Sequence, residues 1–118
     1  MSPHVPLVDS EAIVACCSPV TDGVVTDNAA AALAKMFKAL SDPARVKLIS
    51  LIAASPDGEA CICDLTEPVG LSQPTVSHHI KLLVDAGLAT REQRGKWAYY
   101  RVEGNTLTAL ASALTQTH

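Results

Sequence analysis

The fold of this chain is decided by residues 70–87, GLSQPTVSHHIKLLVDAG, which read as a tight turn followed by one amphipathic helix. Val76, Ile80 and Leu83 stand at positions i, i+4 and i+7, so they form an apolar stripe that faces a core. Ser72 is a favourable N-cap, and Gly87 is placed to end the helix. The opposite side carries polar groups short enough to reach base edges in a DNA major groove, although an ordinary surface helix would show the same pattern. This polar side comprises Gln73, Pro74, Thr75, Ser77, His78 and Lys81.

The composition favours one small helical domain. The chain has 118 residues, 48% of them hydrophobic but only 3% aromatic, so its core must be built from Leu, Val, Ile and Ala. No apolar run approaches the roughly 18 residues that a membrane-spanning helix needs. The N-terminus also lacks the basic and then apolar pattern of a secretory signal. We therefore expect a cytoplasmic protein without a membrane partner.

Charge is unevenly distributed along the chain, whose formal net charge is −3. Residues 1–27 hold four acidic side chains and no Lys or Arg, a local charge of −4. Residues 72–101 hold five basic and two acidic side chains, a local charge of +3. Binding to DNA phosphates requires such a positive segment. Because the local charge is modest, tight binding is expected to need two copies acting together.

Two domain-level segments are expected, an N-terminal arm at residues 1–26 and a folded domain at residues 27–118. The first helix of the domain begins at Asp27 or Asn28 and ends near residue 40, and a second runs from Pro43 to about residue 54. The first has an apolar stripe of Leu33, Met36, Phe37 and Leu40. The second is expected to bury Val46, Ile49 and Ile52 and to expose Arg45 and Lys47.

A short helix near residues 64–68, the turn at Gly70 and the helix after Ser72 make a helix-turn-helix. Residues 88–92 and 97–102 then form two β-compatible runs around Gly95, which predicts a hairpin. Its tip carries Arg94 and Lys96, so the hairpin is interpreted as a wing that straddles the DNA backbone.

The last helix begins at Asn105 and needs a partner for its apolar face, which consists of Leu107, Leu110, Ala111 and Leu114. Packing against the first helix of a second copy would bury it. The sequence therefore predicts a mainly α winged helix-turn-helix with a small β-hairpin, forming a homodimer through its first and last helices.

Four cysteines occur as two pairs, Cys16-Cys17 and Cys61-Ile62-Cys63. In a reducing compartment, free thiols or metal ligands are expected rather than disulfides. Soft thiolates select thiophilic ions. Cys61 and Cys63 share a face only in an extended segment and point apart on a helix, so both geometries remain open.

Four motifs in this order resemble the ArsR/SmtB family of metal-responsive winged-helix repressors. They are FKALSDPAR at residues 37–45, CICDL at 61–65, LSQPTVSHHIKLL at 71–83 and GKWAYY at 95–100. The resemblance implies a homodimer that binds a palindromic operator in double-stranded DNA and releases it when a metal or metalloid binds. It assigns DNA contacts to Ser72, Gln73, Thr75, Ser77, His78 and Lys81, and to Arg94 and Lys96 in the wing.

The metal ligands that the resemblance implies are Cys16, Cys17, Cys61 and Cys63. One arsenic-sensing branch has a third cysteine where this chain has Thr66. Another has an adjacent pair on the arm, completed by a cysteine of the other subunit, as is possible here. A cadmium- and lead-sensing branch uses two arm cysteines with a Cys-x-Cys box. The zinc and nickel site on the last helix is absent, since residues 105–118 offer only His118.

We therefore expect As(III) or Sb(III) as the inducer, bound by Cys16, Cys17 and either Cys61 or Cys63. The alternatives are Cd(II) or Pb(II) on four cysteines, or thiol oxidation as the signal in the same fold. A sequence-independent architectural DNA binder is a further alternative. A thiol enzyme is not expected, because neither cysteine pair sits in a recognisable catalytic motif.

Overall fold

The computed structural model describes residues 19–21 and 23–115. Helices α2 (Asp27–Leu40) and α3 (Pro43–Ala54) are followed by the 3-10 turn η1 (Pro56–Gly58) and the short strand β1 (Glu59–Ala60). The middle of the chain forms α4 (Ile62–Val69) and α5 (Gln73–Asp85). The hairpin strands β2 (Ala89–Arg94) and β3 (Trp97–Val102) and the last helix α6 (Gly104–Ala113) complete the order. The mainly helical winged helix-turn-helix predicted from sequence is confirmed.

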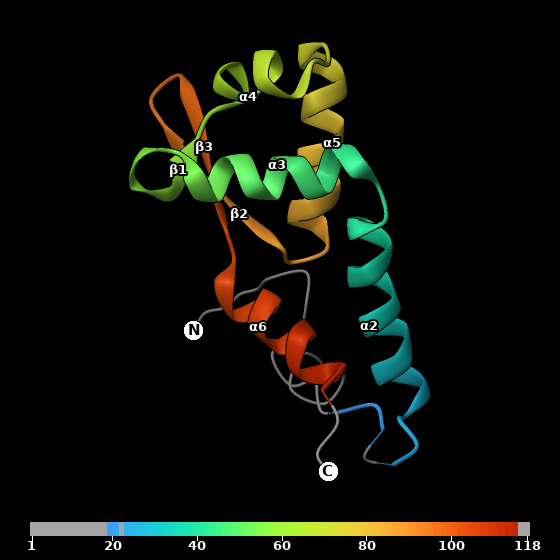
Figure 1. Ribbon diagram of the computed structural model, residues 1–118. Coiled ribbons are helices and arrows are strands. Elements are labelled where there is room, and N and C mark those ends of the chain that lie inside the picture. Colours follow the sequence, from blue (N-terminus) through green and yellow to red (C-terminus); the bar gives the residue numbers. More distant parts are fainter. Residues whose placement is uncertain (1–18, 22, 116–118) are drawn as a thin grey trace.

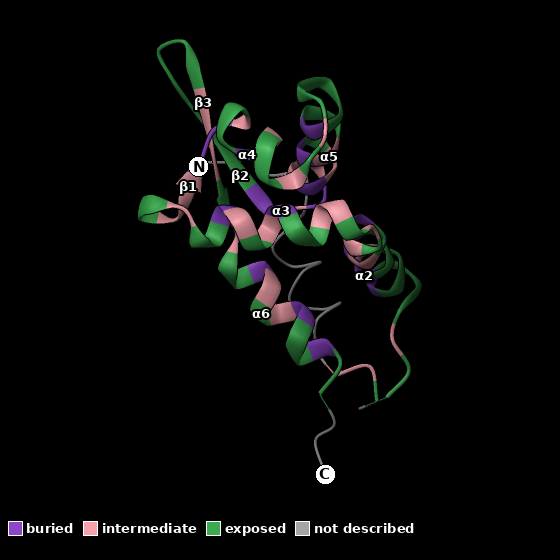
Figure 2. Ribbon diagram, turned by 45° about the horizontal axis from the view of Figure 1, so that its top comes forward, coloured by how far each residue is buried: buried purple, intermediate pink, exposed green. Residues whose placement is uncertain are grey.

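The core lies where α3, α4 and α5 meet the base of the sheet, and α2 and α6 add buried side chains to it (Figure 1). Its largest fully buried side chains are Met36, Leu48, Ile52, Leu65, Val76, Ile80, Leu83 and Leu88. They include the whole apolar stripe predicted for α5, which Figure 2 shows as buried positions along that helix. Helices α2 and α6 extend from this core toward the same end of the molecule (Figure 1). None of the helices in the described residues is long and apolar enough to cross a membrane.

The wing belongs to a three-stranded antiparallel sheet with the order β1-β3-β2. The hairpin was predicted, and its strands extend to Arg94 and begin again at Trp97 around Gly95, whose φ is +59°. The third strand was not predicted. It pairs Glu59 with Arg101 and Ala60 with Tyr100, so the segment before Cys61 is part of the wing sheet.

The predicted inner face of α3 is wrong at Val46, which is 53% exposed. Leu48 and Ile52 are fully buried instead, and Ile49 is half-buried. Helix α3 is apolar on nearly all sides, so its sequence period does not select one face. The expectation that Arg45 is solvated is also wrong, because its guanidinium contacts two other helices, as described below. Lys47 is exposed as predicted.

Helix α6 leaves part of its apolar stripe exposed in the single chain, where the sequence predicts that a second copy covers it. Leu110 is buried and Leu107 half-buried, as expected, but Ala111 is exposed and Leu114 is 61% exposed. Thr106 and Ala113 take the buried positions instead. The face that meets the core is therefore rotated relative to the leucine stripe, and part of that stripe is left on the surface.

Candidate nucleic-acid interface and cysteine site

Helix α5 presents its polar side to solvent. Ser72 takes the N-cap position as predicted, and its hydroxyl lies 2.9 Å from the hydroxyl of Thr75. Lys81 makes a surface ion pair with Asp85 at 2.8 Å. Gly87, with φ +79°, follows the helix and turns the chain into β2. The polar residues predicted for base contact are exposed without exception, namely Ser72, Gln73, Thr75, Ser77, His78 and Lys81.

His79 lies beside this face and contacts Arg45 of α3. Nη1 of Arg45 donates to Nδ1 of His79 at 3.1 Å, and Nε of Arg45 donates to the carbonyl of Ala39 at the end of α2. One side chain thus connects α2, α3 and α5. Sequence reasoning missed this contact because the two residues are 34 positions apart and Arg45 was assigned to solvent.

The two basic residues predicted at the wing tip differ in their surroundings. Lys96 is exposed and makes no ion pair within the described part of the chain. Arg94 instead pairs with Glu59 of β1 and with Glu92 of its own strand, and its guanidinium carbon lies 4.6 Å from the centroid of the Tyr99 ring. The hydrogen bond from Arg94 lowers the pKa of the Glu59 carboxyl, and the same bond raises the pKa of Arg94.

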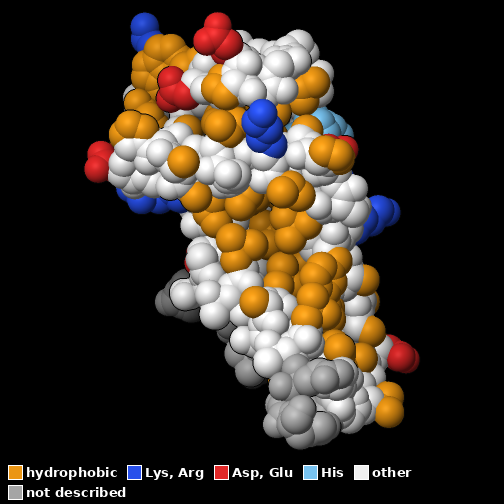
Figure 3. All heavy atoms as spheres, in the orientation of Figure 1, with side chains coloured by type: hydrophobic (Ala, Val, Ile, Leu, Met, Phe, Trp, Pro, Cys, Tyr) orange, Lys and Arg blue, Asp and Glu red, His pale blue; other side chains and the backbone are white. Residues whose placement is uncertain are grey.

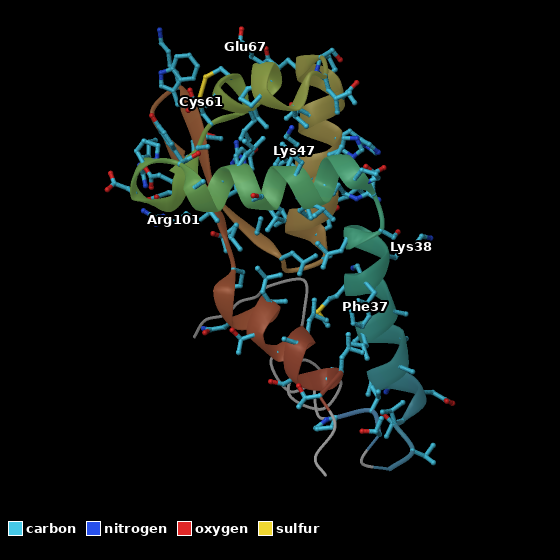
Figure 4. All side chains as sticks on the ribbon, in the orientation of Figure 1. Phe37, Lys38, Lys47, Cys61, Glu67 and Arg101 are labelled. Atoms are coloured by element: carbon cyan, nitrogen blue, oxygen red, sulfur yellow. A yellow bond between two sulfur atoms is a disulfide. The ribbon has the colours of Figure 1, made fainter. Side chains whose placement is uncertain are left out.

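Cys61 and Cys63 come together at the start of α4. Cys61 is the N-cap and has extended backbone angles, whereas Cys63 already belongs to the helix. This change of backbone geometry between them turns both sulfur atoms to one side, where they form a disulfide (Figure 4). The expectation of free thiols is therefore not met at this pair. Cys61 is buried, and Cys63 is exposed.

Asp64 completes a group of three possible metal ligands whose donor atoms lie within 4.8 Å of one another. Its Oδ2 accepts from the backbone N–H of Cys61 at 3.3 Å and lies 3.2 Å from Cys61 Sγ. The signal in the sequence that could have found Asp64 is its position directly after Cys63, in the same motif. The other two predicted ligands, Cys16 and Cys17, lie outside the described residues.

Comparison with known proteins identifies the family to which this helix-turn-helix belongs. Residues 42–91 match the family described as bacterial regulatory protein, arsR family. The chain is 38% identical over 76 residues to an arsenical resistance operon repressor of Bacillus subtilis, which covers 64% of this chain and 70% of that protein. It is 42% identical over 71 residues to a homologue of a cadmium resistance transcriptional regulatory protein from Staphylococcus aureus, covering 60% and 57% of the two chains.

A solved structure gives the same fold. The homodimeric winged helix-turn-helix domain of a possible ArsR-family regulator from Mycobacterium bovis superposes with a TM-score of 0.61 at 25% identity, covering 75% of this chain and 83% of that one. A helix-turn-helix with a basic wing defines a DNA-binding regulator rather than an enzyme. The chain belongs to the ArsR family of transcriptional regulators.

Proposed function

We propose that this protein is a metalloid-responsive repressor whose dimer binds operator DNA and releases it when As(III) or Sb(III) binds cysteine thiolates. The observation that carries the proposal is the convergence of Cys61 and Cys63 at the start of α4, the first helix of the helix-turn-helix. In the reduced form these residues offer two soft donors beside the DNA-binding unit. Relatives named for arsenical and cadmium resistance support the same class of inducer.

In this proposal the chain has two segments with different roles. Residues 1–26 act as an arm that carries Cys16 and Cys17, and residues 27–118 form the DNA-binding and dimerisation domain. The trivalent ion accepts up to three bonds from thiolate sulfur. Cys16 and Cys17 supply two of these thiolates, and either Cys61 or Cys63 supplies the third.

The attachment point of the arm favours a site completed between subunits. The backbone N–H of Val20 donates to the carbonyl of Ala113 at 2.9 Å, at the end of α6. Figure 1 shows α6 running away from β1 and α4, and its 10 residues span about 15 Å. Cys17 precedes Val20 by three residues, which reach at most about 11 Å. This reach is shorter than the path back to Cys61, so we assign the third sulfur to the partner subunit.

The apolar surface of α2 and α6 supports the homodimer. Figure 3 shows hydrophobic side chains gathered on one face over α2, α6 and the adjoining part of α3. Leu114, at the end of α6, is 61% exposed, and Phe37 of α2, labelled in Figure 4, is half-buried. Contiguous apolar surface of this kind marks a protein interface. Two copies joined here would present two α5 helices to a palindromic operator, at half-sites about 34–36 Å apart.

Release of DNA follows as a population shift in this scheme. The arm thiolates and the partner subunit's Cys61 or Cys63 are joined only in the loaded dimer, which restrains the spacing between the two α5 helices. A coupling free energy of about 1–3 kcal/mol changes operator affinity roughly 5- to 150-fold. Such a change is sufficient for a repressor to respond to its inducer.

The test is operator release by the wild type and four single variants, Cys16→Ser, Cys17→Ser, Cys61→Ser and Cys63→Ser. A fluorescent duplex selected from random sequences by the wild-type protein serves as operator, and a phosphine reductant keeps the thiols free. We expect Cys16→Ser and Cys17→Ser to bind the operator like the wild type but to ignore arsenite and antimonite. Normal release by arsenite in both arm variants would contradict the proposal. Release by cadmium or lead, but not by arsenite, would assign the four-cysteine alternative.

The Cys61–Cys63 disulfide favours a second candidate, a thiol-redox regulator of the same fold. In that reaction a peroxide takes two electrons from the two thiols, and the products are one disulfide and reduced peroxide, which for hydrogen peroxide is two molecules of water. Release of the operator by hydrogen peroxide without any metal, abolished in Cys63→Ser, would support this candidate. Retention of the operator under those conditions would exclude it.

A further inference from the structure

We propose that Glu59 is a positioning residue for the DNA-contacting wing, and that it acts through Arg94. Glu59 stands in β1, on the opposite side of the central strand β3 from Arg94 in β2. Its side chain is only 13% exposed, which is unusual for a carboxylate in so small a sheet. This low exposure reflects contacts with two arginines.

Both carboxylate oxygens of Glu59 are used. Oε2 pairs with Nη1 of Arg94, while Oε1 accepts from Nη2 of Arg94 at 2.8 Å and from Nη2 of Arg101 at 2.7 Å. The contact with Arg94 is therefore bidentate, which fixes the plane of the guanidinium as well as its position. Nη1 of Arg101 donates further to the carbonyl of Asp57 at 3.0 Å, in the turn before β1. Figure 4 shows Arg101 beside this turn and Cys61 beyond the strand.

These contacts change the role expected for Arg94. Its guanidinium makes four hydrogen bonds, all of them to Glu59 and Glu92, and lies over the Tyr99 ring, while 41% of the side chain remains exposed. Carboxylates balance the charge of Arg94, whereas Lys96 has no carboxylate partner among residues 19–21 and 23–115. We therefore assign the phosphate contact of the wing tip to Lys96. Arg94 instead links the hairpin to β1 through its ion pair with Glu59.

Loss of the Glu59 carboxylate should therefore affect the affinity for DNA in general and the preference for the operator in opposite directions. A hairpin fixed by Glu59 meets the DNA in one orientation, which favours the operator over other sequences. Removing the carboxylate adds one uncompensated positive charge and loosens the hairpin. Binding to any DNA then gains from the charge, while binding to the operator loses its fixed geometry.

Glu59→Gln tests this, with Glu67→Gln as the matched control. Glu67 is an exposed residue of α4 that makes no ion pair in the described part of the chain, so both substitutions change the net charge equally (Figure 4). Affinity for the selected operator and for a scrambled duplex is measured without metal over a range of salt. We expect Glu59→Gln to lower the ratio of the two affinities about fivefold. Its salt slope on scrambled DNA should steepen by about one ion.

Arg94→Gln decides whether Glu59 acts through Arg94, and it keeps the proposal testable if Glu59→Gln unfolds. We expect Arg94→Gln to lower the affinity ratio while leaving the salt slope unchanged, and we expect the double variant to lack the steeper slope of Glu59→Gln. A slope that falls by about one ion in Arg94→Gln would make Arg94 itself the phosphate contact and overturn the proposal. Equal affinity ratios for Glu59→Gln, Glu67→Gln and the wild type would overturn it too.

Discussion

Arg45 and His79 show how much of the recognition helix depends on one side-chain contact. The guanidinium of Arg45 holds α5 through His79 Nδ1 and holds α2 through the carbonyl of Ala39. Since a guanidinium offers only N–H donors, Nδ1 of His79 is the acceptor in this contact. The next residue back, His78, is exposed on the polar side of α5.

Substitutions at His79 should distinguish the contribution of its hydrogen bond to stability from the contribution of its ring. Asparagine places an acceptor oxygen close to the position of Nδ1, whereas leucine offers none. We expect His79→Leu to destabilise the domain by about 1 kcal/mol. This corresponds to a drop of roughly 4–8 °C in Tm for a domain of this size, with His79→Asn close to the wild type. Thermal unfolding followed by circular dichroism measures the difference.

His78→Leu is the matched control for this measurement, because its ring is exposed and its removal leaves Arg45 paired. It should leave Tm unchanged while weakening operator binding. Equal losses of stability in His79→Asn and His79→Leu would show that the ring, and not its acceptor nitrogen, is what matters.

The elements differ in how far they could be predicted from sequence. Helix α5 has one apolar stripe, an N-cap and a terminal glycine that agree with one another, so its bounds and its buried face were predictable. Helix α3 is apolar on nearly all sides, and only tertiary packing decides that Leu48 rather than Val46 is buried. Strand β1 has two residues, too few for any periodic signal, and exists because β3 offers it a free edge.

For Cys61 and Cys63, the sequence predicted a pair of donors in one motif but left their geometry open. Whether Cys61 and Cys63 point together depends on the residue at which α4 begins, and the predicted start at residue 64 was two residues late. The true start, at Ile62, places one cysteine in extended backbone and the other in the helix. Asp64 is the third nearby donor for the same reason, since it lies in the first turn and reaches back to the N-cap.

The wing as an element makes a prediction about Lys96. An exposed lysine at a hairpin tip contacts phosphate without reading sequence. We expect Lys96→Ala to weaken binding to the operator and to scrambled DNA by the same factor, and to reduce the salt slope by about one ion. Titrations of both duplexes at several salt concentrations measure this. Lys38→Ala, on α2 away from the wing, is the control and should change neither quantity (Figure 4).

At the scale of the whole molecule, the exposed part of the apolar stripe at the end of α6, Ala111 and Leu114, matters most. The monomer has few ways to cover it, since α2 and α6 extend together from the core and carry apolar side chains on one face (Figure 3). The proposed dimer interface would cover the part of the α6 stripe that the single chain leaves exposed. Part of the stripe contributes to folding of the chain, and the remainder is available for pairing.

Leu114→Glu tests this interpretation. A carboxylate at a position that is 61% exposed in the single chain should cost the monomer little but should disrupt an apolar interface. We expect the wild type to sediment as a dimer and Leu114→Glu as a monomer at micromolar concentration, with weakened operator binding. Thr90→Glu, an exposed change on β2, should remain dimeric. A dimeric Leu114→Glu protein would place the interface elsewhere.

Trp97 gives the protein a built-in optical probe. It is the single tryptophan of the chain, it opens β3 at the wing tip, and it is 55% exposed. Its emission therefore reports on the solvent environment of the wing tip. Trp97 fluorescence in a titration with unlabelled DNA measures contact between the hairpin and the DNA. The anisotropy of a labelled duplex measures binding of the whole protein. Comparing the two titrations shows whether the hairpin contacts the DNA at the same concentration at which the protein binds.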